Sequence, residues 1–185
     1  MELSRHCALC ENEITSLKKG VTCRLTGEKP DFIEKCPDIV LDEKFQEKLG
    51  NTNLELERTR KVKNNVYLTF YILIIIGFLL IIGNKMYAEL TYSTTYYWLF
   101  RVSAIAAGIT VLMGAYNKLN RFRNKLKIAE FEKNKIDSVL KEYGISYKTN
   151  FDFKEKIHGN QNIEITIEYK NWTKKRTTTT WVINC

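Results

Sequence analysis

The longest uninterrupted apolar segment of the chain covers residues 66–83, which include no charged side chain. These 18 residues would form a helix roughly 27 Å long, because an α-helix rises about 1.5 Å per residue. That length matches the hydrocarbon core of a bilayer. The segment begins far from the N-terminus and lacks a cleavage-site pattern, which excludes a signal peptide. We therefore predict a transmembrane helix over 66–83, with a helix buried in a soluble core as the alternative.

A second apolar run, residues 96–116, is less hydrophobic and contains Arg101. Small residues recur on one helical face of this run, at Ala104, Gly108 and Ala115. Small side chains let two helices approach closely where lipid provides no hydrophobic force for association. The pattern therefore predicts a span that packs against another helix. Arg101 follows a cluster of aromatic residues, so it is interpreted either as reaching the headgroups or as an inward-facing charge in a pore or interface.

Beyond this run, residues 117–143 keep apolar positions at alternating steps of three and four. The positions are Leu119, Phe122, Leu126, Ala129, Ile136, Leu140 and Tyr143, with Lys133 as the one polar interruption. This heptad pattern predicts a coiled-coil seam, and with it an oligomer. The alternative is an amphipathic helix that packs on strands of its own chain. The same phase extends back through residues 108–115, so one continuous helix is expected to join the second span to this segment.

After Gly144 the hydrophobic period changes to two, which is typical of strands. Alternating apolar residues over 151–153, 163–169 and 177–183 predict a three-stranded antiparallel meander packed on the preceding helix. The turn before the third strand carries Lys174, Lys175 and Arg176. These side chains are candidates for phosphate contact, on lipid headgroups or on nucleic acid, with a solvated turn as the alternative.

The segment ahead of the first span, residues 42–65, is predicted to be helical. Asp42 is a suitable N-cap for a helix beginning at Glu43, and Gly50 with Asn51 is expected to break it. Thr52 or Asn53 would then cap a second, basic helix that runs directly into the span.

The net charge of +8 is unevenly distributed. Basic residues flank both apolar runs, whereas residues 84–95 between them include only one, Lys85. The flanking residues are Arg58, Arg60, Lys61 and Lys63 before the first run and Lys118, Arg121, Arg123, Lys125 and Lys127 after the second. By the positive-inside rule both termini are cytoplasmic and residues 84–95 form an external loop. Anionic lipid headgroups are the expected partner of this positive charge, and nucleic acid is not expected.

Four cysteines precede the first span: Cys7, Cys10, Cys23 and Cys36. The predicted orientation places them in a reducing compartment, where a structural disulfide is disfavoured. Four thiolates suit tetrahedral Zn²⁺, and the C-x2-C spacing lets two sulfurs reach one ion. We therefore predict a structural zinc site, with His6 as a substitute for one thiolate. Four unlinked thiols are the alternative.

This N-terminal segment resembles a group of uncharacterised small bacterial membrane proteins. The shared pattern is C-x2-C, then G-x2-C-x-L-T, then an aromatic residue shortly before a last cysteine. It is formed here by Cys7, Cys10, Gly20, Cys23, Leu25, Thr26, Phe32 and Cys36. The resemblance covers about 40 residues, and it implies membrane location and metal binding rather than an activity.

The expected fold class is a mainly α membrane protein built on a two-span helical hairpin. The expected parts are a zinc-knuckle module (1–41), a basic helix (42–65), the hairpin (66–116, with spans 66–83 and 96–116), a heptad helix (117–143) and a small β module (144–185). The heptad helix is expected to be a cytoplasmic extension of the hairpin, and the C-terminal part is expected to be a small α+β module with a three-stranded antiparallel sheet.

No catalytic constellation is recognisable, since the chain has only two histidines and no nucleophile-elbow, P-loop or Rossmann motif. We therefore expect a non-enzymatic protein of the bacterial inner membrane, oligomeric, that binds a partner or signal in the cytoplasm. Its spans would transmit that signal or permeabilise the membrane, as a pore-type or defence effector does. The alternatives are a recruitment module without channel activity and an enzyme that acts on lipid or nucleic acid.

Overall fold

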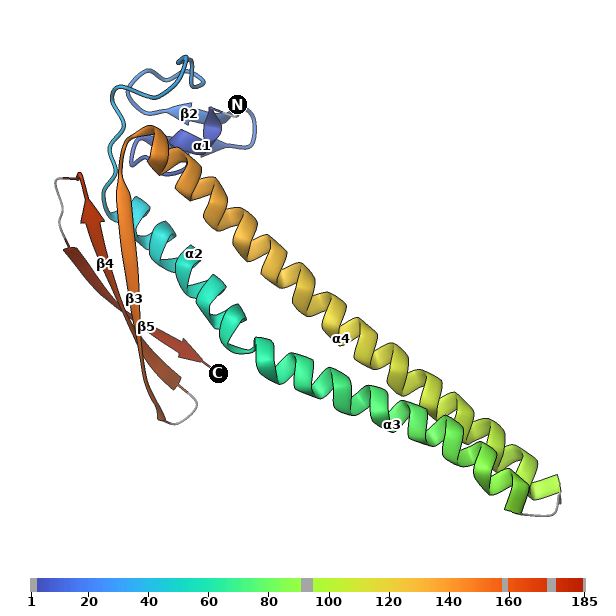
Figure 1. Cartoon of the computed structure of the whole chain (residues 1–185). Helices are drawn as coiled ribbons and strands as arrows, with labels where there is room; N and C mark the ends of the chain where they lie inside the picture. The colour runs from blue at the N-terminus through green and yellow to red at the C-terminus, as the bar shows by residue number, and fades with distance from the viewer. Residues whose placement is uncertain (1–2, 91–94, 158–159, 173–175, 185) are drawn as a thin grey trace. The chain divides into compact units, whose positions relative to one another are not determined.

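The computed structural model describes residues 3–90, 95–157, 160–172 and 176–184. Its elements follow the chain in the order α1, β1, β2, α2, α3, α4, β3, β4 and β5 (Figure 1). The helices are α1 (Ser4–Cys7), α2 (Glu43–Lys61), α3 (Lys63–Leu90) and α4 (Thr95–Glu142). The strands are β1 (Glu13–Ser16), β2 (Gly20–Cys23), β3 (Ser146–Ile157), β4 (Asn160–Lys170) and β5 (Arg176–Asn184).

The chain divides into two compact units. The first contains Met1–Glu57 and Ala129–Cys185, and the second contains Arg58–Ile128. The boundaries fall inside α2 and inside α4. The N-terminal cysteine segment and the C-terminal strands, expected as separate modules, thus belong to the same unit.

The sheet of the first unit is an antiparallel meander in the order β3-β4-β5, as the alternation of apolar residues predicts. β4 is central, and Ile165 lies opposite Phe151 of β3 and Thr179 of β5. Alternate β4 residues point into the core, so Ile163, Ile165 and Ile167 are at most 3% exposed. The intervening Glu164 lies on the other face, where it pairs with Lys154 at 3.3 Å.

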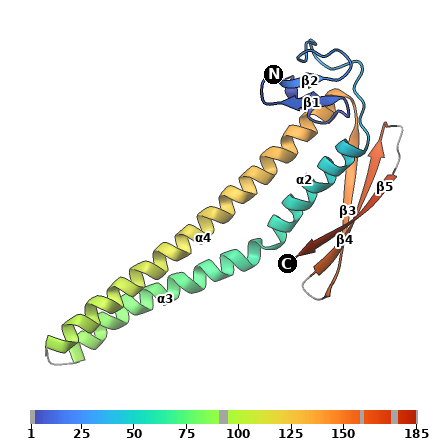
Figure 2. The same cartoon turned by 180° about the vertical axis from the view of Figure 1, so that it is seen from behind.

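The core of the first unit joins this sheet to α2, α4 and the N-terminal segment. Phe45 and Leu49 of α2 are fully buried against the same cluster as Leu140 of α4 and the β4 isoleucines. Leu9, from the cysteine segment, is 2% exposed and belongs to this cluster. Both cartoon views show the sheet alongside α2 (Figures 1 and 2). The cysteine segment therefore shares a hydrophobic core with the rest of its unit.

The expected break of α2 at Gly50 and Asn51 is wrong, because the helix runs unbroken from Glu43 to Lys61. Leu49 and Leu54 are both buried in the core on either side of these residues. Their burial outweighs the roughly 1 kcal/mol by which glycine disfavours a helix interior. Asn53 is accordingly a mid-helix residue rather than a cap.

Only Val62 separates α2 from α3, so the basic helix leads directly into the first apolar run, as predicted. The Val62 N–H donates to the Arg58 carbonyl at 3.3 Å, and the Val66 N–H donates to the Val62 carbonyl at 3.0 Å. Helical hydrogen bonding thus continues across the junction. α3 then extends to Leu90, so residues 84–90 are helical rather than part of a loop. Good helix formers such as Met86 and Leu90 account for this extension.

α3 and α4 of the second unit run antiparallel and side by side in both views (Figures 1 and 2). The two helices approach each other closely at Gly77 and Gly108. A Cβ on Gly108 would lie 3.1 Å from the Gly77 carbonyl oxygen and 2.8 Å from Ile81 Cγ1. Tyr67 and Phe122 pack edge to face with ring centroids 6.2 Å apart. The face of small residues on the second apolar run therefore packs against α3 of the same chain.

Both long helices are long and apolar enough to cross a membrane. Their most apolar 18-residue windows are only 6% and 11% buried in the structure. The core helix of a soluble protein would be mostly buried instead. Most of the apolar surface of the hairpin, including Leu79 and Leu99 at 64% and 69% exposure, thus lacks cover from the described chain.

α4 is one continuous helix of 48 residues, which joins the second apolar run to the heptad segment as predicted. α4 ends at Glu142, and Gly144 shortly after it has a φ of +69°, the left-handed conformation that favours glycine. The Ile145 N–H donates to the Leu140 carbonyl at 3.0 Å and closes this C-cap. The chain then reverses into β3.

Candidate functional site

Short local structures bring the four N-terminal cysteines together. The Cys10 N–H donates to the Cys7 carbonyl at 2.9 Å, which closes the C-x2-C turn after α1. The β1–β2 hairpin, which the sequence pattern did not reveal, pairs Cys23 with Glu13 and returns the chain to this turn. A turn at Gly27 follows, and the chain then reaches Cys36. All four side chains line one cavity of about 330 Å³.

The four cysteines are free thiols in a partly buried setting. Cys7 and Cys10 are 8% and 6% exposed, and Cys23 and Cys36 are half-buried. Burial, together with smaller contributions from negative charge on Cys36, Cys10 and Cys23, raises the pKa of Cys7 to about 11. Burial also raises the pKa of Cys36, although a hydrogen bond from the Asp38 backbone opposes this. Because these pKa values are raised, several thiolates would form together in this cluster only around a compensating cation.

The donor set suits zinc chemically. Two backbone N–H groups, from Asn12 at 3.5 Å and Val40 at 3.4 Å, donate to the Cys10 sulfur and would stabilise a thiolate there. Within the described ranges, no three Cys, His, Asp or Glu side chains are already gathered so that they could hold an ion.

His6, the suggested substitute ligand, is directed toward α4. Its Nδ1 lies 3.0 Å from the Tyr143 hydroxyl, and its Nε2 lies 3.2 Å from Glu142 Oε2. Burial lowers the pKa of His6, and Glu142 partly offsets this. The Tyr143 hydroxyl also accepts the Cys36 N–H at 2.9 Å. Glu142, the last residue of α4, and Tyr143, which follows it, thus contact the cysteine segment at both His6 and Cys36.

α2 provides a second set of contacts to the same segment. The Lys44 N–H donates to Glu11 Oε1 at 2.6 Å, and the Lys44 ammonium pairs with Glu13. The Lys48 ammonium donates to the Ala8 carbonyl at 3.2 Å. These polar contacts surround Leu9, which enters the core. The first turns of α2 and the last turn of α4 therefore contact the segment that forms the cysteine-lined cavity.

The predicted packing residues lie along α4. Ala115, Leu119 and Phe122 are at most 6% exposed, Gly108 is buried, and Ala104 and Leu126 are half-buried. Gly108 contacts Gly77 and Ile81, and Phe122 contacts Tyr67, all within the chain. Farther along the heptad, Ile136 and Leu140 are buried in the core of the first unit. In these contacts the heptad face meets elements of its own chain.

Of the predicted charged sites, Arg101 and Arg176 are among the described residues, and both are exposed. The Arg101 side chain is exposed, and its backbone carbonyl accepts a hydrogen bond from Asn84 Nδ2 at 3.3 Å. Arg176 is exposed at the start of β5, opposite Glu168 of β4. Lys174 and Lys175 lie outside the described residues.

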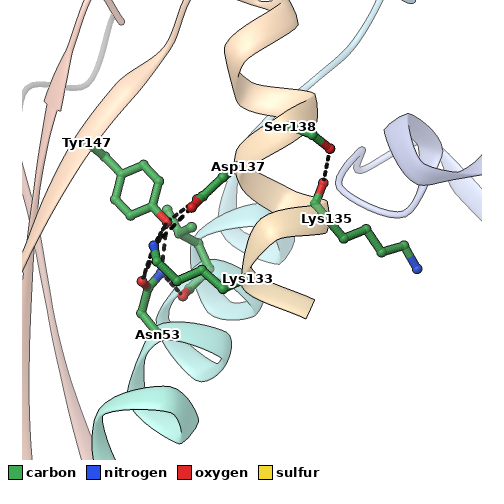
Figure 3. A network of polar contacts seen from close by, with 7 residues as sticks. Asn53, Lys133, Lys135, Asp137, Ser138 and Tyr147 are labelled. Carbon is green, nitrogen blue, oxygen red and sulfur yellow. Dashed lines mark hydrogen bonds and ion pairs between the residues drawn. The ribbon is translucent and has the colours of Figure 1, made fainter. Parts of the chain in front are cut away.

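A polar network that the sequence did not reveal surrounds Lys133 (Figure 3). The Lys133 ammonium donates to Asn53 Oδ1 at 3.0 Å and to the Tyr147 hydroxyl at 2.8 Å, and it pairs with Asp137 at 3.2 Å. The Tyr147 hydroxyl donates to Asp137 at 2.5 Å, and burial followed by this bond raises the pKa of Tyr147. The only available signal was the Lys133–Asp137 spacing of four, which is typical of a helical ion pair.

No protein-family model, curated protein or solved structure matches the chain.

Proposed function

We propose that this chain is a membrane-anchored recruitment module without channel activity, in which the α3–α4 hairpin is the anchor. The observation that carries this proposal is the uncovered apolar surface of the hairpin, whose most apolar windows are 6% and 11% buried. Leaving so much apolar side-chain surface in water costs about 25 cal/mol per Å². A bilayer removes this cost. Contiguous apolar surface of this extent is typical of proteins that insert in membranes.

The proposed location is the bacterial cytoplasmic membrane, with both termini in the cytoplasm. Basic residues flank the ends of the hairpin that join it to the first unit, and Lys85 is the only one in residues 84–95. Positive charge is retained on the cytoplasmic side of such hairpins. The first unit, with its cysteine segment and its sheet, would then be cytoplasmic.

The second part of the proposal is that the four cysteines hold one structural Zn²⁺. Their shared cavity and the two N–H donors to Cys10 support it. Four thiolate ligands complete a tetrahedral shell, which leaves no position for substrate. Zinc would supply folding energy to a segment that has few apolar residues of its own. A recruitment surface held in shape by metal is the expected result, rather than a catalyst.

Pore formation has less support because the residues that would pack between copies have contacts within the chain. Gly108 faces Gly77 and Ile81, and Phe122 faces Tyr67. A second candidate function, transmission of a signal along α4, is favoured by one observation. α4 is unbroken from Thr95, and its last residue, Glu142, contacts His6 beside the cysteines.

Two measurements on the full chain separate these functions. The protein is purified in mild detergent for light scattering, and it is also reconstituted in liposomes loaded with a self-quenched dye. A recruitment module is monomeric at micromolar concentration and releases no dye. A pore releases dye, and Arg101→Ala would change that release if the arginine lines the path. Oligomers with dye release would refute the proposal, and a protein that stays soluble at alkaline pH without detergent would refute the anchor.

A further inference from the structure

The second unit carries a dense set of hydrogen-bond donors at one end of its apolar hairpin. Residues 58–65 and 117–128 include nine Lys or Arg side chains, five Asn and no Asp or Glu. We call the basic and asparagine residues of these two segments the basic collar. Its basic members are Arg58, Arg60, Lys61, Lys63, Lys118, Arg121, Arg123, Lys125 and Lys127, and its asparagines are Asn64, Asn65, Asn117, Asn120 and Asn124.

The antiparallel packing of α3 and α4 brings the two halves of the collar to the same level. Tyr67 packs on Phe122, with ring centroids 6.2 Å apart. One turn from this contact, toward the start of α3 and the end of α4, lie Lys63 and Lys125 respectively. The basic residues of both helices therefore lie at the same end of the hairpin.

The collar side chains of α4 face outward. Leu119 and Phe122 are buried against the rest of the unit at 5% and 6% exposure, whereas all five basic residues of this segment are exposed. Asn117, Asn120 and Asn124 are also exposed, at a helical spacing of three and four. Ammonium, guanidinium and amide N–H groups all donate hydrogen bonds, and residues 117–128 themselves include no carboxylate.

The collar begins where the apolar run ends. Lys63 is three residues before Val66, and Lys118 is two residues after Tyr116. At about 1.5 Å per residue, both side chains lie within one helical turn of the apolar surface. If the hairpin crosses a bilayer as proposed above, the collar therefore lies at the depth of the lipid phosphates. Nucleic acid would have to lie flat on the membrane to reach it.

From this placement we infer that the basic collar is a binding site for the phosphates of anionic phospholipids. This inference rests on the proposed membrane hairpin and adds a chemical selectivity to it. Each basic residue near an anionic surface contributes about 1 kcal/mol to the attraction. The collar should thus enrich anionic lipid around the hairpin and hold its cytoplasmic end at the headgroups.

The test uses the full chain reconstituted in vesicles of equal parts phosphatidylglycerol and phosphatidylcholine. After brief extraction in mild detergent, mass spectrometry counts the two headgroups retained by the protein. A collar variant carries Lys118→Gln, Arg121→Gln and Lys125→Gln. A control variant loses the same charge in the first unit, by Lys35→Gln, Lys148→Gln and Lys170→Gln, which are all exposed positions.

We expect the wild type and the control to retain phosphatidylglycerol over phosphatidylcholine by about fivefold or more, the ratio equivalent to about 1 kcal/mol. The collar variant keeps six of the nine basic residues, so its preference should be clearly smaller than that of the wild type and the control, and high salt should reduce the wild-type preference. Equal retention by an inserted wild-type protein would overturn the lipid site alone. Failure of the protein to insert would overturn the anchor itself. Collar-dependent binding of a 20-base-pair DNA duplex, tighter than that of the lipid, would replace lipid by nucleic acid.

Discussion

Lys133 is the polar residue that interrupts the heptad of α4, and its replacement by methionine should destabilise the first unit. The change keeps the length of the aliphatic chain and removes the ammonium, which donates to Asn53 Oδ1 at 3.0 Å. Asn53 is 4% exposed, so water cannot easily replace this donor. The remaining neighbour of Asn53 Oδ1 is the Tyr147 hydroxyl at 3.5 Å, which already donates to Asp137 at 2.5 Å.

The expected loss is that of a buried acceptor left without a partner, about 1–3 kcal/mol. The ion pair with Asp137 adds little to this figure, because that carboxylate is 37% exposed and is screened by solvent. A second substitution should recover most of the loss. Asn53→Leu together with Lys133→Met removes both partners and replaces them with apolar groups of similar shape, which can be nearly neutral.

Urea unfolding of the full chain in mild detergent measures these free energies. Trp172 packs on Tyr169 and Phe45 with ring centroids 4.5 Å and 5.4 Å away, so its fluorescence reports the first unit. Trp98→Phe in all variants removes the signal of the hairpin. The reasoning is refuted if Lys133→Met unfolds at the same urea concentration as the wild type. It is also refuted if adding Asn53→Leu to Lys133→Met lowers the free energy of unfolding by as much as Asn53→Leu does in the wild type.

Three further outcomes are expected. Gly108→Ala places a methyl group 2.8 Å from Ile81 Cγ1 and should destabilise the hairpin by about 1–3 kcal/mol. Gly114→Ala is the control, because its methyl group meets nothing within 4 Å and should not destabilise the hairpin. Unfolding in sodium dodecyl sulfate, followed by circular dichroism, compares the two variants, and equal effects would contradict the close approach of the helices. Purified, reduced protein should contain about one zinc per chain by elemental analysis, and Cys23→Ser should lose it; absence of metal in the wild type would favour plain thiols. Tyr143→Phe removes the acceptor of the Cys36 N–H and should increase hydrogen exchange around Cys36 but not in β4, so unchanged exchange would show that this contact is unimportant.

The elements with strong periodicity were predictable from sequence. The two apolar runs and the alternating isoleucines of β4 identify the long helices and the central strand, because each signal repeats over many residues. The continuity of α4 follows from a heptad phase that carries through Gly108 and beyond Leu119. In each case the pattern within one segment is sufficient.

The features that were missed depend on distant parts of the chain. α2 passes through Gly50 because Leu49 and Leu54 are buried against β4 and α4, which local propensity does not report. Lys133 donates a hydrogen bond to Asn53, which lies 80 residues away in the sequence. The short β1–β2 hairpin has too few alternating positions to show a period. The cysteine spacing indicated a shared site, but the contacts of His6 with the end of α4 were not visible in it.

Membrane insertion with both ends on the cytoplasmic side is the central claim, and labelling in intact bacterial cells tests it most directly. Thr91, between α3 and α4 in the sequence, is replaced by cysteine, and cells are exposed to a membrane-impermeant maleimide. The account predicts that Thr91→Cys is labelled in intact cells, while the cysteines of the native chain react only after lysis. Labelling of the native chain in intact cells, with no increase from Thr91→Cys, would contradict it.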